Sequence, residues 1–154
     1  MAKSTQIIEQ HVPKAKLVGK ARLKVLFWNV YDSELYAQDG VWTPDQPFAL
    51  SLQYLRDLQG RDIAKRSIEE MRKQGFSDEV AMTRWHDTLL NIIPNVSNNS
   101  TVVGIQDANK STILYHNDNL LGEVSEPLFT EWFFNIWLGE KTSQPALRRQ
   151  LLGA

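Results

Sequence analysis

Apolar and polar side chains alternate along the first third of the chain. The alternation begins at Leu17 and continues to residue 37, which predicts one long strand with a bend or bulge at Asp32-Ser33. Residues 48–54 alternate in the same way and predict a second strand, which Gly60 ends. The polar residues 1–16 lack this pattern, and we expect them to form a loose lead-in.

The apolar period then changes to that of a helix. Over residues 61–73 the apolar side chains share one stripe, which predicts an amphipathic helix closed by Gly75. Ser77 is expected to cap a second helix, and Pro94 stops it.

Strands and then helices recur in the second half of the chain. Residues 101–106 and 111–116 predict a hairpin, with a further strand close behind. After the expected cap at Ser125, a nearly all-apolar helix runs to Gly139, so most of its sides must be buried. This order favours an α+β fold with an antiparallel sheet, and without a visible linker residues 17–154 form a single domain.

Composition narrows the function classes. The chain has 154 residues, with 17 basic and 18 acidic side chains and a net charge of -1. No block of like charge is long enough to predict a nucleic-acid or membrane footprint, and no run of 18 apolar residues predicts a membrane span. The absence of cysteine excludes thiol nucleophiles, disulfides and thiolate metal sites.

Candidate chemistry is sparse among the polar residues. His11, His86 and His116 are far apart, and no metal, phosphate-binding or nucleophile motif occurs, so neither a metal nor a cofactor is predicted. The many aromatic side chains indicate either a well-filled core or the wall of an apolar cavity with a polar contact for a ligand head group. The candidate ligand-binding residues are Lys24, Tyr31, Tyr36, Tyr54, Arg56 and Trp85.

Several stretches resemble bacterial chalcone isomerase-like proteins. The most specific is residues 134–143, FNIWLGEKTS, and the resemblance extends over about residues 17–153. Other matching stretches are residues 18–23, 29–32, 35–37, 47–50, 52–54, 67–71, 147–148 and 151–153. The resemblance implies an open-faced β-sandwich, in which helices cover one side of a large antiparallel sheet.

The resemblance also allows the catalytic positions of plant chalcone isomerases to be compared with this chain. Their tyrosine falls on Ile63, their asparagine on Glu70 and their threonine near Leu26, while their arginine has no clear counterpart and lies closest to Lys14. An enzyme that stabilises an oxyanion needs donors at the developing charge, and Ile63 and Leu26 supply none through their side chains. The resemblance therefore argues against chalcone isomerase activity.

Three hypotheses about function follow. The first is a non-catalytic domain that binds a small hydrophobic or fatty-acid-like ligand in a cleft between sheet and helices, as non-catalytic members of this fold do. The second is an isomerase or lyase that acts through Tyr and Lys or Arg in the same cleft. The third is an interaction module with a packed interior. The resemblance also implies a periplasmic protein whose signal peptide has been removed, with the cytoplasm as the alternative. The oligomeric state stays open.

Overall fold

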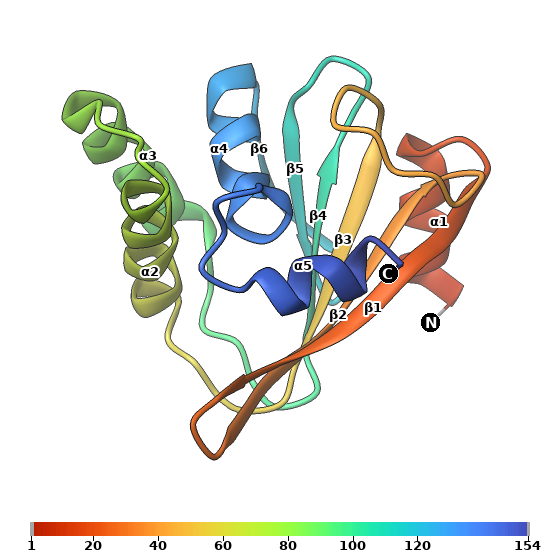
Figure 1. The fold of residues 1–154 in the computed structure, drawn as a ribbon, viewed down its shortest axis with the longest axis horizontal. Coiled ribbons are helices and arrows are strands. Elements are labelled where there is room, and N and C mark those ends of the chain that lie inside the picture. Colours follow the sequence, from red (N-terminus) through yellow and green to blue (C-terminus); the bar gives the residue numbers. More distant parts are fainter. Residues whose placement is uncertain (1, 154) are drawn as a thin grey trace.

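One open antiparallel sheet forms the centre of the molecule (Figure 1). The computed structural model describes residues 2–153. The sheet has six strands, and each strand pairs with the next one along the chain. The strands are β1 (Ala15–Val25), β2 (Trp28–Gln38), β3 (Phe48–Tyr54), β4 (Thr101–Gln106), β5 (Thr112–His116) and β6 (Asn119–Val124).

Helices cover the two faces of this sheet unequally. They are α1 (Ala2–His11), α2 (Gly60–Lys73), α3 (Glu79–Ile92), α4 (Pro127–Leu138) and α5 (Pro145–Leu151). Figure 1 shows α2 to α5 on one side of the sheet and α1 on the other, where α1 contacts β4. The predicted α+β fold, an antiparallel sheet covered by helices, is confirmed.

The prediction of one bent strand over residues 17–37 is wrong, because this segment is a hairpin. β1 and β2 pair with each other, and the turn lies at Leu26-Phe27 rather than at the polar pair within β2. The turn lies within an apolar run, residues 25–28, that contains no glycine, asparagine or proline to mark a reversal. For that reason the pattern alone could not show where the chain reverses.

The lead-in also differs from expectation, since Ala2–His11 is the helix α1 rather than a loose segment. Ile8 of this helix and Val12, which directly follows it, are buried against the far face of the sheet. There they join a small cluster with side chains such as Ile105. Residues 3–13 contain only three large apolar side chains, Ile7, Ile8 and Val12, which were too few to reveal the helix from the sequence.

Most helix boundaries lie close to the predicted ones. Gly75 follows α2 with a φ of 105°, in the left-handed region that glycine tolerates best. The cap of α3 is Asp78 rather than Ser77, because the Asp78 carboxylate accepts a hydrogen bond from the Ala81 N–H at 3.0 Å. Glu126, not Ser125, precedes α4, and Gly60 begins α2 instead of ending a strand.

A close approach at Gly19 brings α5 onto β1. A Cβ atom at this position would lie 2.2 Å from the carbonyl oxygen of Gln150, so only glycine fits. The helix α5 can therefore lie directly across β1 and β2 and close one side of the space beneath it.

Candidate functional site

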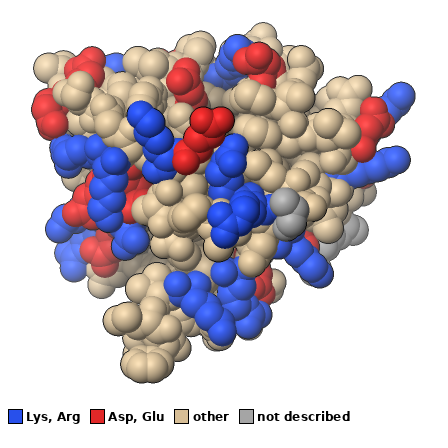
Figure 2. Space-filling model, viewed as in Figure 1, with Lys and Arg blue, Asp and Glu red and all other residues tan. Residues whose placement is uncertain are grey.

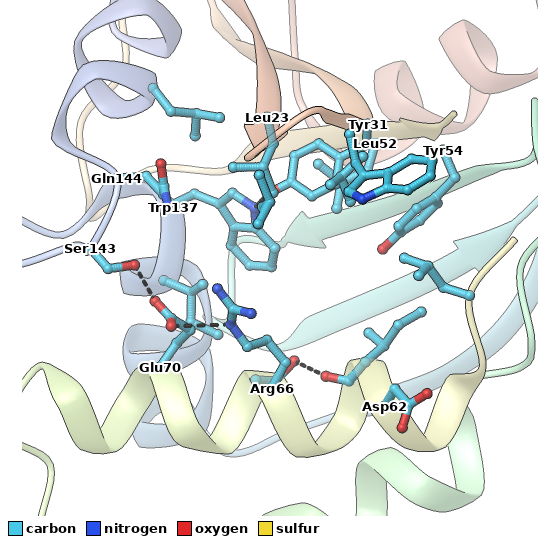
Figure 3. A pocket seen from close by; sticks show the side chains of 18 of the residues that line it. Leu23, Tyr31, Leu52, Tyr54, Asp62, Arg66, Glu70, Trp137, Ser143 and Gln144 are labelled. Carbon is cyan, nitrogen blue, oxygen red and sulfur yellow. Dashed lines mark hydrogen bonds and ion pairs between the residues drawn. The ribbon is translucent and has the colours of Figure 1, made fainter. Parts of the chain in front are cut away.

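A cavity of about 350 Å³ lies between the sheet and the helices α2, α4 and α5. Its size is at the lower end of the range of small-molecule sites, so the interior is not fully packed. Figure 3 shows strand residues on one side and α2 residues on the other. The lining residues are Leu23, Val25, Trp28, Val30, Tyr31, Leu52, Tyr54, Arg56, Leu58, Asp62, Ile63, Arg66, Ser67, Glu70, Ile136, Trp137, Ser143, Gln144 and Leu147.

Strand pairing brings the sheet side of the wall together. Leu23 of β1 pairs with Tyr31 of β2, which pairs in turn with Tyr54 of β3. Alternate residues of a strand share a face, so Leu52 lies beside Tyr54 in the same wall. The rings of Tyr31 and Tyr54 meet edge to face with their centroids 5.8 Å apart. This side of the cavity is therefore mostly apolar, with two phenol hydroxyls.

Both tyrosines stay neutral at physiological pH. Burial raises the pKa of Tyr31 to about 12 even though its hydroxyl oxygen accepts a hydrogen bond from the indole N–H of Trp137 at 2.8 Å. Burial, and secondarily the nearby Tyr31, raises the pKa of Tyr54 as well. Within residues 2–153 no hydrogen bond formed by the Tyr54 hydroxyl is found, and Tyr31 only accepts. Both O–H groups are therefore available to donate.

Arg56 adds a positive charge to this wall. Its guanidinium carbon lies 4.5 Å from the centroid of a Trp28 ring, which is a cation–π arrangement. The Nε atom of Arg56 is buried and has no hydrogen-bond partner among the described residues. A buried donor without a partner costs free energy, so an acceptor that entered the cavity beside Arg56 would relieve that cost.

The α2 side of the cavity carries a network of ion pairs around Glu70. Its carboxylate pairs with Arg66 at 3.2 Å and accepts a hydrogen bond from the Ser143 hydroxyl (Figure 3). It also pairs with Lys73 at 3.2 Å. Burial alone would raise the pKa of Glu70, but the contacts with Ser143, Lys73 and Arg66 together outweigh it and hold the pKa below its usual value. Glu70 is therefore charged and fully engaged, which makes it a poor general base.

Three of the six candidate residues from the sequence meet in the cavity, namely Tyr31, Tyr54 and Arg56. Trp85 does not reach it. The Trp85 ring is buried in the packed core, stacked on Phe76, and its indole N–H donates to Glu126 at 3.1 Å.

Lys24 and Tyr36 also lie outside the cavity. Lys24 is exposed and stands between Leu23 and Val25, which line the cavity, so its own side chain points to the opposite face of the sheet. Tyr36 packs into the cluster beneath α1, where its hydroxyl donates to Glu34 at 2.7 Å. Alternation separates the two faces of a strand but does not say which face borders a cavity, so the sequence could not exclude these two residues.

Of the four positions aligned with catalytic residues of plant chalcone isomerases, two line the cavity and two lie outside it. Ile63 and Glu70 do line the cavity, as their alignment implies. Leu26 instead lies in the hairpin turn with 87% of its surface exposed, and Lys14 precedes β1 away from the cavity. The hairpin residue that brings a hydroxyl to the site is Tyr31.

Several cavity residues were missed in the sequence, among them Arg66 and Ser67 on α2. With Ile63 and Glu70 they recur at spacings of three and four residues, which places them on one face of the helix. Their periodicity was visible, but a mixed polar stripe is also what a solvated helix face looks like. Ser143 and Gln144 come from the loop before α5 and carry no local signal.

Residues 2–153 contain neither a cluster of metal ligands nor a membrane-spanning helix. No three His, Asp or Glu side chains gather there as ligands for a metal ion. No helix in that range is long and apolar enough to cross a membrane.

Comparison with known proteins gives the family and a similar solved structure. A model of the chalcone isomerase-like family matches residues 5–153, so the chain belongs to this family. A crystal structure of a fatty-acid binding protein from Arabidopsis thaliana is similar, with a TM-score of 0.71 and 16% sequence identity over 91% of this chain and 87% of that chain. At this identity the likeness shows the fold. No match was found among curated protein sequences.

Proposed function

We propose that this member of the chalcone isomerase-like family binds a fatty-acid-like molecule in the cavity between β1–β3 and α2. The observation that carries the proposal is a mostly apolar cavity that also contains uncommitted donors. Tyr31 and Tyr54 have hydroxyl protons to donate, and Arg56 has a buried Nε–H without a partner among the described residues.

These donors suit a carboxylate at the end of an apolar chain. A carboxylate accepts several hydrogen bonds at once and is stabilised most by charged or well-aligned donors. The guanidinium of Arg56 supplies the charge, and the tyrosines supply neutral O–H groups. An acyl chain would contact Leu23, Leu52 and the other apolar wall residues, which drives binding by removing apolar surface from water.

The comparison supports the same ligand class. The Arabidopsis thaliana protein with the similar fold is described as a fatty-acid binding protein. Fold alone does not fix function, so the argument depends on the residues of the cavity in this chain.

Catalysis in the same cavity is a second candidate, favoured by one observation. Neutral phenols beside a guanidinium in an apolar site are donors of the kind that stabilise an oxyanion. In contrast, Glu70 is held in ion pairs, which argues against it as the proton acceptor. Incubation with a chalcone tests this candidate: flavanone formation well above the spontaneous rate supports it, and no acceleration removes chalcone isomerisation.

The binding proposal is tested by filling the cavity from α2. Ile63→Trp places a large ring inside the cavity, whereas Arg61→Trp places the same ring on the exposed side of the same helix. Binding is measured by displacement of an environment-sensitive fatty-acid probe with laurate and by native mass spectrometry of solvent-extracted protein.

We expect the wild type and Arg61→Trp to bind the probe saturably and to release it to laurate. Ile63→Trp is expected to remain folded by circular dichroism and to bind at least about tenfold more weakly, which corresponds to a loss of about 1.4 kcal/mol. If the wild type shows no saturable uptake, or if both variants bind equally well, the cavity is not the fatty-acid site.

A further inference from the structure

The tip of the β1–β2 hairpin exposes an apolar run of four residues, 25–28. Leu26 and Phe27 have 87% and 99% of their surface exposed, and Val25 and Trp28 have 39% and 58%. The hairpin projects beyond the rest of the molecule at the lower end of Figure 1, and in Figure 2 this projection ends in a group of uncharged side chains. Single exposed apolar side chains are ordinary, but a cluster of this kind marks an interaction surface.

The local backbone gives no structural reason for these side chains. Leu26 has a φ of 56°, in the left-handed region that is costly for a large side chain. A two-residue hairpin turn with a positive φ at its first central position is normally made with glycine. Leu26 and Phe27 thus neither favour the turn nor pack into the core, so contact with a partner is the role left for them.

Basic side chains stand immediately behind the apolar tip. Lys20 and Lys24 are exposed on β1, and Figure 2 shows Lys and Arg side chains directly above the uncharged end. Arg22 also lies on this strand but pairs with Asp32 at 2.6 Å, and Asp32 is the only acid within residues 20–32. The end of the hairpin therefore keeps an excess of positive charge next to its apolar tip.

An apolar wedge with tryptophan at its boundary and lysines behind it fits the surface of a lipid bilayer. Tryptophan favours the level of the lipid head groups, and lysines near the surface are attracted to anionic lipids. A stable protein interface needs about 800 Å² from each partner, which a convex tip of four residues does not offer. A fluid bilayer, by contrast, closes around a wedge of any shape.

The tip is also continuous with the cavity, since Val25 and Trp28 belong to both. Resting on the proposed fatty-acid function, we propose that residues 25–28 insert into the surface of a bilayer that contains anionic lipids. The end of the cavity lined by Trp28 and Arg56 then faces the membrane, and the fatty acid passes directly between bilayer and cavity.

Vesicle flotation of the full chain tests the contact. Vesicles of phosphatidylcholine alone are compared with vesicles that also contain phosphatidylglycerol. Phe27→Glu places a charge at the tip, while Val80→Glu makes the same change at a residue of α3 that is 82% exposed. The wild type and Val80→Glu should bind the anionic vesicles equally, and Phe27→Glu about tenfold more weakly, the loss expected for one apolar side chain. Lys24→Glu should weaken binding to the anionic vesicles by at least about fivefold and leave neutral vesicles unaffected.

The proposal is overturned if the wild type does not float with anionic vesicles, or if Phe27→Glu binds them as well as Val80→Glu does. It is also overturned if sedimentation shows a wild-type dimer that Phe27→Glu abolishes, since the tip would then contact a second copy. Phe27 does not line the cavity, so Phe27→Glu should keep wild-type affinity for laurate in solution. A different result is that neither the wild type nor a variant binds laurate, while Phe27→Glu still binds vesicles more weakly than Val80→Glu. The fatty-acid function and the transfer of fatty acid would then be wrong, and the membrane contact would stand.

Discussion

The space between the sheet and its helical layer is filled at one end and hollow at the other. At the filled end, which we define by Trp85, Phe129, Phe133 and Phe134, the centroids of neighbouring rings lie 5.3–5.4 Å apart. At the cavity end, around Tyr31 and the other residues of β1–β3 and α2, the layers enclose about 350 Å³.

Both ends are rich in aromatic side chains, so aromatic content does not separate them. They differ in polar groups: at the filled end the Trp85 indole has its partner in Glu126, whereas at the cavity end Tyr31, Tyr54 and Arg56 keep donors free among the described residues. The proposed binding site therefore differs from the filled end in its uncommitted polar groups beside apolar walls rather than in its aromatic rings.

The largest expected effect compares two buried leucines, one at each end. Leu89→Ala on α3, one turn beyond Trp85, should lower the free energy of unfolding by about 3–5 kcal/mol, because the packed surroundings cannot collapse into the space. Leu52→Ala should cost only about 2 kcal/mol, because Leu52 already borders the cavity and has fewer contacts to lose. Urea denaturation measures both, and equal losses would contradict the distinction between the two ends.

A smaller effect concerns the ion pairs of Glu70 at the cavity end. Glu70→Gln should lower the free energy of unfolding at neutral pH by about 1.5–3 kcal/mol, the range for hydrogen bonds to charged groups. The pKa of Glu70 is lowered in the folded state, so its stabilisation is present above the ordinary glutamate pKa and is lost as the pH falls through the folded value.

Urea denaturation between about pH 7 and pH 3 checks the sign of this effect. The difference between the wild type and Glu70→Gln should shrink towards acid pH. Glu69→Gln, a change at the exposed neighbour, is the control and should have little effect at any pH. A Glu70→Gln deficit that stays constant down to pH 3 would show that the charge of Glu70 is not what stabilises the fold.

The smallest effect compares tyrosines on the two faces of the sheet. Tyr54→Phe removes a cavity hydroxyl and should weaken laurate binding about tenfold, the loss expected for one hydrogen bond to a carboxylate. Tyr36→Phe removes a hydroxyl that donates to Glu34 beneath α1 and should leave the affinity unchanged. Calorimetric titration measures the laurate affinity of both variants. If only Tyr36→Phe lost affinity, the laurate site would lie on the face of the sheet beneath α1 and not in the cavity.

Much of the fold could be predicted because period and caps are local properties. The alternation over β3 and the stripe on α2 gave those elements directly, and Gly75 closed the helix as expected. The hairpin at Leu26-Phe27 could not be predicted, because its turn is made by apolar residues whose backbone strain is invisible in a sequence. Without that reversal, residues 25–28 looked like the middle of a strand, so the sequence did not reveal the apolar tip.

The candidate site could be predicted only in part. Tyr31 and Tyr54 lie in strands whose alternation the sequence shows, and Arg56 continues the two-residue spacing just past the end of β3. Trp85 could not be separated from them, since one large aromatic residue looks like another until its neighbours are known. Ser143 reaches the cavity from a loop distant in sequence, which only the three-dimensional structure shows. The periplasmic location stays a prediction, because no observation on this chain tests it.

The most direct test of the account is to map laurate binding with amide chemical shifts of the ¹⁵N-labelled protein. We expect saturable shifts that cluster on β1–β3 and on α2, around Tyr31, Tyr54 and Ile63, while the amides around Phe129 and Phe133 change little. Shifts centred on the aromatic rings of the filled end, or no saturable shifts at all, would contradict the claim that the cavity end holds a fatty acid.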